Sequence, residues 1–405
     1  MAITSLQNDS PAGERKARYI MIGGFLGAGK TTAVAQLAKY LSSQSLKVGL
    51  ITNDQGSGLV DTAALRSQGF ATEEIPGGCF CCRFDSLLEA AKRLNEASRP
   101  EVFVAEPVGS CTDLVATVTY PLRRIYGDQF GVAPLSVLVD PIRAQRIMGL
   151  SDAGRFSDKV VYIYRKQLEE ANLIVINKKD LLASDELEAL QSALEAAFPQ
   201  ARVLQISARN GEGLKEWFDI LTGEWQPEMP TREVDYDIYA EGEALLGWLN
   251  ATITIQRDEA FDGNAVIDRL AALIKDQLSE AGAEIAHLKM TLSPNSGLGD
   301  LAVVNLVRND LVPELGQRLE DAMGAGQLIL NLRAETDPER LEAWVRGCCE
   351  ALSQSAFPGL SVTVDDLERF RPGRPEPTHR DLVSSAVLIL GWQRFVEGRG
   401  SEGEG

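Results

Sequence analysis

Lys30 and Thr31 close a glycine-rich run that follows one apolar stretch and precedes another with helical character. Residues 24–31 fit the pattern G-x-x-x-x-G-K-[ST], in which small residues let backbone N–H groups converge on a phosphate at the positive end of the next helix. Lys30 would neutralise β- and γ-phosphate charge, and Thr31 would hold magnesium. The chain is therefore predicted to bind a nucleoside triphosphate. The residues expected to line it here are Gly24, Gly27, Ala28, Gly29, Lys30, Thr31 and Thr32.

The choice of base is indicated by Asn177, Lys178 and Asp180, which follow an apolar run and fit an N-K-x-D motif. The carboxylate of Asp180 can accept two hydrogen bonds from guanine, whereas adenine would leave this carboxylate unpaired. Lys178 would lie along the ring face, and Asn177 would brace the loop. Further along, Ser207 and Ala208 begin a stretch that resembles the last guanine-contacting loop of GTPases. We therefore expect the nucleotide to be GTP.

Two acidic residues, Asp54 and Glu106, are candidates for the hydrolysis machinery, because each follows an apolar, strand-like run. Acidic residues at the C-terminal ends of parallel strands lie beside the phosphate crevice, where they can bind magnesium or orient an attacking water. With Lys30 they form the predicted catalytic set, and with Thr31 the predicted magnesium ligands. The alternative for each is an ordinary helix cap or turn. Gly109 would permit close approach to the γ-phosphate.

Cys79, Cys81 and Cys82 place three thiols within four positions, and they are half of the six cysteines in the chain. A C-x-C pair can place two thiolates on one soft metal ion at about 2.3 Å, and the third cysteine or Glu74 can complete a partial shell. A closed structural zinc site usually brings a second C-x-x-C or C-x-x-H pair. None occurs here, so an open site that can transfer its ion is favoured. A strained disulfide between neighbours and a buried apolar cysteine turn are the alternatives.

The ordered motifs GGFLGAGKTT, NDQG, EIPGGCFCC, EPVG and NKKD resemble those of the CobW-type metallochaperone GTPases, relatives of the nickel-handling GTPases of urease and hydrogenase maturation. The resemblance covers roughly residues 18–222 and is most specific through GGCFCC. It implies a guanine-nucleotide switch that binds a transition metal at the cysteine loop and releases it to a client on hydrolysis. By position, the resemblance assigns phosphate to Gly24, Gly29, Lys30 and Thr31, metal to Cys79, Cys81 and Cys82, the magnesium loop to Glu106, and guanine to Asn177 and Asp180.

The chain departs from the family pattern in three places. Residues 53–56 read Asn-Asp-Gln-Gly where the family usually has Asn-Glu-Phe-Gly, and Pro107-Val108 replace Thr-Thr, which leaves the role of Asp54 open. The histidine-rich stretch of many relatives is missing, since only His287 and His379 occur. Delivery of a single ion is therefore expected rather than storage of several.

Thiolate ligands suit zinc, cobalt and copper alike, and zinc or cobalt is the expected cargo. The expected partners are a client metalloprotein or a cofactor-synthesis enzyme, together with a second copy of the chain in a nucleotide-dependent homodimer. The main alternative is a GTP-gated assembly chaperone for a metalloenzyme or a cobalamin-type cofactor, in which the cysteines sense metal without delivering it. A non-catalytic binding module with a structural metal turn is a third class.

Composition limits these readings further. The net charge of −18 argues against nucleic-acid or anionic-membrane binding, because phosphate contacts need clustered Lys and Arg. No stretch of the sequence reaches the length of about 18 apolar residues that a transmembrane helix needs, so none is expected. The polar N-terminus lacks the apolar core of a signal peptide. We expect a cytoplasmic protein without membrane or nucleic-acid partners.

Apolar runs alternate with helical stretches up to about residue 223, which predicts an α/β P-loop GTPase domain with a mainly parallel sheet. A smaller α+β C-terminal domain is predicted beyond it, from a few strands and two amphipathic helices. The expected ranges are a disordered lead-in at 1–17, the GTPase domain at 18–223, a linker at 224–237, the C-terminal domain at 238–375, and a terminal helix with a disordered acidic tail at 376–405.

The remaining cysteines carry weaker signals. Cys348 and Cys349 lie in a helical pattern with an apolar stripe, which favours core packing over a second metal site. Cys111 lies five positions after Glu106, where it could approach the nucleotide.

Overall fold

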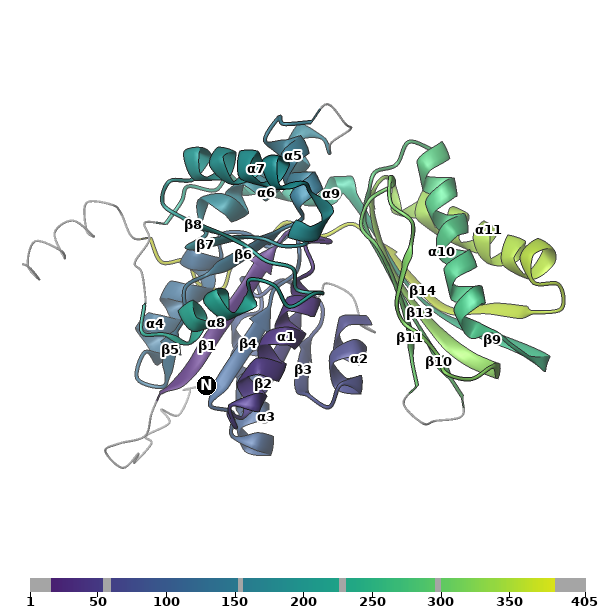
Figure 1. Cartoon of the computed structure of the whole chain (residues 1–405), viewed down its shortest axis with the longest axis horizontal. Coiled ribbons are helices and arrows are strands. Elements are labelled where there is room, and N and C mark those ends of the chain that lie inside the picture. Colours follow the sequence, from purple (N-terminus) through teal and green to yellow (C-terminus); the bar gives the residue numbers. More distant parts are fainter. Residues whose placement is uncertain (1–15, 54–59, 152–155, 226–230, 296–299, 383–405) are drawn as a thin grey trace, which may run out of the picture.

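The computed structural model describes residues 16–53, 60–151, 156–225, 231–295 and 300–382 (Figure 1). Asp54, one of the predicted magnesium ligands, lies outside this part of the chain, as do most of the expected lead-in and acidic tail.

The first sheet is parallel, with the strand order β3-β2-β4-β1-β6-β7-β8, and β5 pairs with β1. Most of its strands contain continuous apolar runs because helices cover both faces and few positions meet water, whereas β3 reads Ala-Thr-Glu-Glu-Ile and is only partly buried. The strands are β1 (Ala17–Gly24), β2 (Val48–Asn53), β3 (Ala71–Ile75), β4 (Val102–Glu106), β5 (Phe130–Val132), β6 (Ser136–Val139), β7 (Leu173–Ile176) and β8 (Arg202–Gln205).

The helices of this domain form two layers with separate apolar cores. Helices α1, α2 and α8 pack on one face, and α3 to α7 pack on the other (Figure 1). Their bounds are α1 (Lys30–Ser43), α2 (Val60–Ser67), α3 (Phe84–Ser98), α4 (Tyr120–Tyr126), α5 (Pro141–Ile147), α6 (Asp158–Glu169), α7 (Ser184–Ala197) and α8 (Leu214–Thr222). A π-helical turn at Val115–Thr119 precedes α4, and a 3-10 turn occupies Lys179–Leu181.

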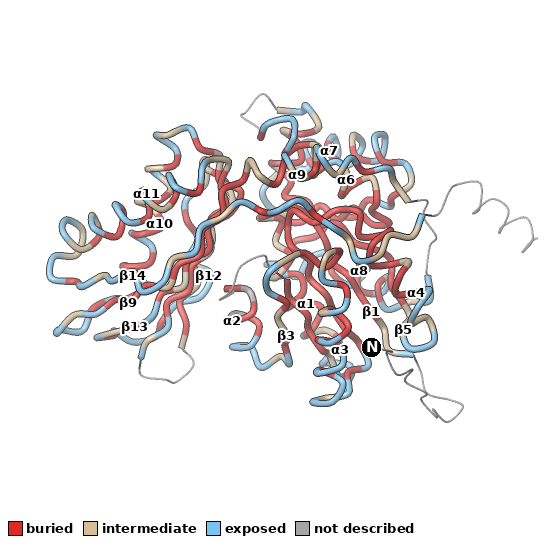
Figure 2. Tube along the Cα trace, turned by 180° about the vertical axis from the view of Figure 1, so that it is seen from behind, coloured by how far each residue is buried: buried red, intermediate tan, exposed pale blue. Residues whose placement is uncertain are grey.

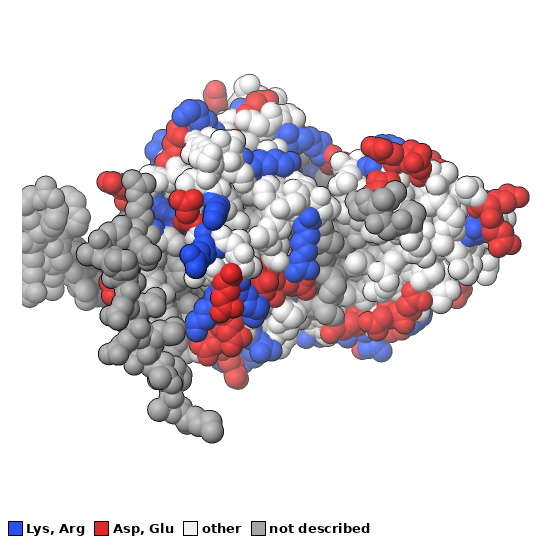
Figure 3. All heavy atoms as spheres, turned by 90° about the horizontal axis from the view of Figure 1, so that it is seen from below, with Lys and Arg blue, Asp and Glu red and all other residues white. Residues whose placement is uncertain are grey.

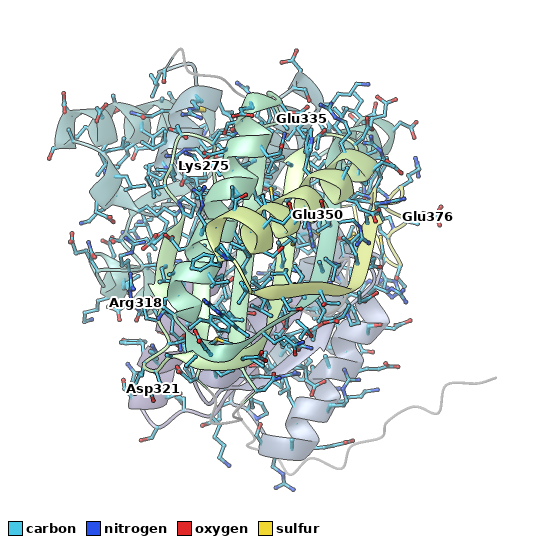
Figure 4. All side chains as sticks on the ribbon, turned by 90° about the vertical axis from the view of Figure 1, so that its right-hand side faces the viewer. Lys275, Arg318, Asp321, Glu335, Glu350 and Glu376 are labelled. Atoms are coloured by element: carbon cyan, nitrogen blue, oxygen red, sulfur yellow. The ribbon has the colours of Figure 1, made fainter. Side chains whose placement is uncertain are left out.

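The second domain is an antiparallel sheet with the strand order β12-β11-β10-β13-β9-β14. Helices α10 and α11 lie across its outer face and enclose an apolar core, as Figure 4 shows. Its elements are β9 (Leu246–Phe261), α10 (Gly263–Glu280), β10 (Ile285–Pro294), β11 (Ala302–Leu306), β12 (Glu314–Gln317), β13 (Met323–Glu335), α11 (Pro338–Ala351), a π-helical turn (Leu352–Ala356) and β14 (Ser361–Phe370). The predicted fold class, a parallel α/β domain followed by an α+β domain, is confirmed.

Two segments connect the domains. Helix α9 (Tyr236–Leu245) begins within the range expected as a linker, and it packs closely on α6, where a Cβ at Gly242 would lie 2.5 Å from the carbonyl oxygen of Lys159. After β14, residues 371–382 leave the second domain and return along the first, across the face shown in Figure 2. We call residues 371–382 the return segment.

Surface charge is mixed on the face shown in Figure 3, where Lys and Arg alternate with Asp and Glu without forming a continuous basic area. Within the described residues, none of the helices has the length and apolar character needed to cross a membrane. The cytoplasmic location expected from the sequence stays a prediction.

Candidate functional site

The predicted phosphate loop joins the end of β1 to the start of α1. Gly24 has φ 131° and a Cβ there would lie 2.3 Å from the carbonyl oxygen of Leu138, so this position requires glycine. Lys30 opens α1, is buried at 7% exposure, and its ammonium donates to the carbonyl oxygen of Gly24 at 2.9 Å. The lysine is thus held over the loop in the position from which phosphate charge can be neutralised.

The predicted guanine-reading residues are built directly onto this loop. The amide nitrogen of Asn177 donates to the Ala28 carbonyl at 2.9 Å, and the backbone N–H of Ala208 donates to the Asn177 amide oxygen at 3.0 Å. Lys178 donates to the Gly27 carbonyl at 2.8 Å. A Cβ at Gly29 would lie 2.4 Å from the Asn177 amide nitrogen, so the brace needs a glycine there. The three loops form one unit.

Asp180 stands apart from this brace, with an exposed side chain at the 3-10 turn that follows β7. Ser207 is buried, and its hydroxyl accepts from the N–H of Asn210, which shapes the loop after β8. The bracing role expected of Asn177 is thus seen in the structure, and the carboxylate of Asp180, expected to read the base, lies at the surface.

Glu106 and Thr31 meet although they are far apart in the sequence. Glu106 ends β4 at 5% exposure and accepts a hydrogen bond from the Thr31 hydroxyl at 3.0 Å. The loop that follows Glu106 also touches the phosphate loop, because a Cβ at Gly109 would lie 2.8 Å from the backbone nitrogen of Leu26. Two of the predicted magnesium ligands are thus brought together at the phosphate loop.

The cysteine loop follows β3 and is held by a side chain at the end of the neighbouring strand, β2. The side-chain amide of Asn53, at the end of β2, donates to the carbonyl oxygens of Ile75 at 2.8 Å and Gly78 at 2.6 Å. The loop therefore begins beside the edge of the sheet at which β2 ends in Asn53 and β4 ends in Glu106.

The sulfur atoms of Cys79, Cys81 and Cys82 all lie within 4.8 Å of one another, and the thiols are free. The Sγ of Cys82 is 3.3 Å from that of Cys79 and 3.6 Å from that of Cys81. Hydrogen bonding to Cys79, together with burial, raises the pKa of the Cys82 thiol to about 11. Among the described residues, this group is the one in which three potential ligands gather, and the Glu74 carboxylate is not part of it.

A fourth thiol, that of Cys111, is 1% exposed and lies in the same apolar core, but it is not part of the group whose sulfurs gather within 4.8 Å. Its interactions with the thiols of Cys79 and Cys81 lower the pKa of Cys111 to about 6 and raise the pKa of Cys81 well above its ordinary value. The sequence indicated only that Cys111 could approach the nucleotide. That it shares a core with the cysteine loop depends on β4 lying beside β2.

The return segment was also missed by sequence reasoning, because its residues carry no periodic pattern. The backbone N–H of Thr378 donates to the Cys81 carbonyl at 2.9 Å, and that of Glu376 donates to the Cys82 sulfur at 3.2 Å. The ring of His379 packs edge-on against Phe84, with 5.0 Å between the centroids. In Figure 4, Glu376 is seen at the margin of the second domain, on the segment that leads back to the cysteine loop.

A buried ion-pair network joins the nucleotide loops to the second domain. Asp140 begins α5 at 2% exposure and accepts from Lys178 at 2.9 Å and from Arg308, after β11, at 2.6 Å. Burial alone would raise the pKa of Asp140, but Lys178, Arg308 and Arg143 outweigh it and hold the pKa at about 2.

Arg143 adds a second link between the domains. Its guanidinium donates to the Leu26 carbonyl at 2.6 Å and to the Val307 carbonyl at 2.5 Å, and it lies over the ring of Phe156 at 5.0 Å. An Asp-Pro pair after an apolar run is the sequence signal for the helix cap at Asp140, but nothing in the sequence indicates its partner across the domain boundary.

Comparison with known proteins agrees with these observations. Residues 18–205 match the family model of the CobW/HypB/UreG nucleotide-binding domain. The zinc chaperone CobW of Sinorhizobium sp is 30% identical over 220 residues, which cover 50% of this chain and 61% of that protein. The zinc chaperone YeiR of Escherichia coli is 28% identical over 177 residues, which cover 43% of this chain and 50% of that protein. The chain thus matches about half to three fifths of the length of these curated relatives.

Among solved structures, the zinc-bound YjiA GTPase of Escherichia coli aligns with 83% of this chain and 99% of its own, at 15% identity and a TM-score of 0.37. The match of residues 18–205 to the CobW/HypB/UreG nucleotide-binding domain confirms the resemblance inferred from the motifs.

Proposed function

We propose that the chain is a GTP-hydrolysing metallochaperone that binds one transition-metal ion at the cysteine cluster and hands it to a client. The observation that carries this proposal is the gathering of Cys79, Cys81 and Cys82 on a loop that is anchored at the polar edge of the nucleotide sheet. A nucleotide site alone is common to many proteins. A cluster of free thiols at the same edge of the sheet as Glu106 favours metal handling over nucleotide binding alone.

In this proposal the phosphate loop binds the triphosphate through Lys30 and backbone N–H groups, and Asp180 reads the guanine. The brace from Asn177 to Ala28 and Ala208 supports this assignment, because it ties base recognition and phosphate binding into one rigid unit. The other proposed contacts are those of Gly24, Gly27, Gly29, Thr32, Gly109, Lys178 and Ser207. The exposed carboxylate of Asp180 is free to accept hydrogen bonds from the base.

The donor set also fits a magnesium ion. Thr31 and Glu106 lie 3.0 Å apart at the phosphate loop, and a hydroxyl with a carboxylate oxygen is the ligand chemistry that magnesium prefers. These two residues would hold the ion, which supplies positive charge to the β- and γ-phosphates when bound. A role for Asp54 in the same site stays a prediction from the sequence, as does a role for Glu74 at the metal cluster.

The cargo is most consistent with zinc, because three soft thiolates suit this ion and the matched relatives are named zinc chaperones. Cobalt fits the same ligands. The client is proposed to be a metalloprotein or a cofactor-synthesis enzyme, and a nucleotide-dependent homodimer is part of the same proposal.

The experiment that tests the proposal compares zinc affinity of the full chain with magnesium-GTP, as a slowly hydrolysed analogue, and with magnesium-GDP. Competition with a chromophoric chelator gives the affinity. We expect one zinc per chain and tighter binding in the GTP state, by the roughly 5- to 150-fold that allosteric coupling typically supplies. Zinc must then tighten the GTP analogue by the same factor.

The matched variants are Cys81→Ser with Cys82→Ser, and Cys348→Ser as a control in the core of the second domain. The double variant should lose zinc and keep GTP binding, whereas the control should keep both. Equal zinc affinity in the GTP and GDP states would contradict a delivery switch and favour a structural metal turn. Nucleotide-dependent binding without zinc transfer to a purified client apoprotein would favour the assembly chaperone that only senses metal.

A further inference from the structure

We propose that the return segment is a nucleotide-controlled cover of the cysteine loop. The cover is closed while a triphosphate supports the loop that follows Glu106, and it opens when that support is lost. This inference rests on the proposed function, because it supplies the means by which one nucleotide state retains the ion and the other releases it. The contacts that carry it run without a break from the phosphate loop to Cys82.

The return segment lies on the end of the cysteine loop that holds Cys81 and Cys82. The backbone N–H of Glu376 donates to the Cys82 sulfur at 3.2 Å, and that of Thr378 donates to the Cys81 carbonyl at 2.9 Å. The Thr378 hydroxyl donates to the Cys82 carbonyl at 3.2 Å. Cys82 is the least buried of the three loop thiols even beneath this segment. A client that takes an ion from Cys82 therefore has to displace these contacts.

The far end of the return segment is anchored on the loop that follows Glu106. The Arg380 guanidinium donates to the buried carboxylate of Asp113 at 2.6 Å, and the backbone N–H of Asp381 donates to the Ala116 carbonyl at 2.8 Å. Asp113 has φ 63°, a left-handed backbone conformation that a residue with a Cβ keeps only where its surroundings hold it. Arg380 is thus one of the groups that hold the end of this loop in place.

The other end of the same loop belongs to the nucleotide site. Glu106 accepts from the Thr31 hydroxyl at 3.0 Å, and a Cβ at Gly109 would lie 2.8 Å from the backbone nitrogen of Leu26 in the phosphate loop. The γ-phosphate, which we propose to lie at Gly109, would support the loop in this position. Loss of that phosphate on hydrolysis removes the support.

The middle of the loop is braced by two helices. The side-chain amide of Gln167, on α6, donates to the carbonyl oxygens of Gly109 and Cys111, each at 2.9 Å. The hydroxyl of Ser110 donates to the buried carboxylate of Glu243 on α9. A segment held in this way moves as a unit with its neighbours, because closely packed groups pass a small shift on instead of absorbing it.

A shift that reaches Asp113 weakens its bond to Arg380, because a charge-assisted hydrogen bond depends on a short and well-aligned contact. The other ion pairs of the return segment are poor substitutes for this anchor. Arg374 pairs with Asp237 at 3.0 Å, but their side chains are 52% and 80% exposed, and exposed pairs hold little. Release of Arg380 therefore frees the segment and uncovers Cys82.

The experiment measures how fast a maleimide labels Cys82 in the zinc-free full-length protein, followed by peptide mass spectrometry, with the magnesium-bound GTP analogue and with magnesium-GDP. In the wild type we expect labelling to be slower with the GTP analogue by about fivefold or more, the lower end of typical allosteric coupling. Arg380→Gln should label fast in both states, so that the difference disappears. Arg380→Lys keeps the charge and should restore part of it. Arg374→Gln is the control and should behave as the wild type.

Affinity for the GTP analogue checks that each variant folds and binds nucleotide. Equal labelling rates in the two nucleotide states of the wild type, faster labelling with the GTP analogue, or an unchanged difference in Arg380→Gln would overturn the inference. The proposed function would still stand if zinc affinity depended on the nucleotide. A labelling difference that requires Arg380, together with equal zinc affinity in the GTP and GDP states, would support the cover and contradict the delivery switch.

Discussion

At the scale of single residues, the proposed recognition of the base is concentrated in Asp180. Its neighbours Asn177 and Lys178 are occupied by the phosphate loop, so Asp180 is the member of the motif whose side chain is left for the ligand. A carboxylate can accept two hydrogen bonds from guanine, and one altered group should therefore change the preferred base.

The substitution Asp180→Asn should weaken GTP binding by about 2 kcal/mol and improve binding of xanthosine triphosphate, whose ring offers the complementary acceptor. Competition with a fluorescent nucleotide measures both affinities. Asp185→Asn, an exposed acid in the first turn of α7, is the control and should leave the preference unchanged. An unaltered GTP preference in Asp180→Asn would remove the basis for the guanine assignment.

Residues within a motif were predictable because the chemistry fixes their spacing. Lys30 and Asn177 lie where their motifs placed them, since a phosphate loop and its brace work only with these residue types at these positions. Asp140 was not predictable as the partner of Arg308, because this contact depends on the docking of the two domains.

At the scale of elements, the return segment acts as a cover for the cysteine loop. It pairs with the loop through the N–H of Thr378 and through that of Glu376, and Arg380 anchors its end on the buried Asp113 at 2.6 Å. Cys82 is the half-buried member of the cluster, so the cover lies where a reagent or a client would reach it.

We expect Thr378→Pro to expose Cys82, because proline removes the N–H that bonds to Cys81. Stability should fall by only about 1 kcal/mol, the usual net contribution of one hydrogen bond. The rate at which a maleimide labels Cys82, followed by peptide mass spectrometry, should rise several-fold. Thr378→Ala keeps the backbone donor and loses only the hydroxyl contact with Cys82, so it should label nearly as slowly as the wild type. Equal rates in the two variants would mean that the segment does not protect the site.

Six strands of the first sheet, β1, β2, β4, β6, β7 and β8, were predictable because each contains an apolar run. β3, which reads Ala-Thr-Glu-Glu-Ile, and the three-residue β5 lack this signal and were not predicted. Helix α9 and the return segment were not predicted either. The burial of Tyr239 and Glu243 comes from packing against α6 and Ser110, which no local pattern reveals.

At the scale of the whole molecule, the second domain docks directly on the nucleotide loops. A Cβ at Gly27 would lie 2.8 Å from Val307, so the backbone of the phosphate loop and the end of β11 are in contact. The network of Asp140, Arg308 and Lys178 crosses the same boundary. Lys178 of the predicted guanine motif and Arg308 of the second domain thus share one buried carboxylate. Sequence patterns predicted both domains, but docking depends on charges that pair only in the folded molecule.

Asp140 should be a principal support of this boundary. Its pKa of about 2 lies below the ordinary 3.8, so the ionised form stabilises the fold at every pH above 3.8, and this contribution is lost as the pH falls through 2. The difference corresponds to about 2 to 3 kcal/mol at roughly 1.4 kcal/mol per pKa unit. Replacing the carboxylate also removes the charge partner of Lys178 and one of the two carboxylates paired with the buried Arg308.

We therefore expect Asp140→Asn to lower the free energy of unfolding by about 3 to 5 kcal/mol at pH 7, the usual cost of breaking a buried ion pair. Denaturant unfolding between pH 3 and 8 measures it. The penalty should stay nearly constant above about pH 5 and shrink below it, because the carboxylate of the unfolded chain then binds a proton that the folded one does not. Asp310→Asn removes the second carboxylate paired with Arg308. Because Asp310 is 48% exposed, this cost should stay near or below about 1 kcal/mol. A penalty for Asp140→Asn that stays the same down to pH 3 would show that the carboxylate has the same pKa in the folded and the unfolded chain. The charge network would then not be what joins the second domain to the nucleotide loops.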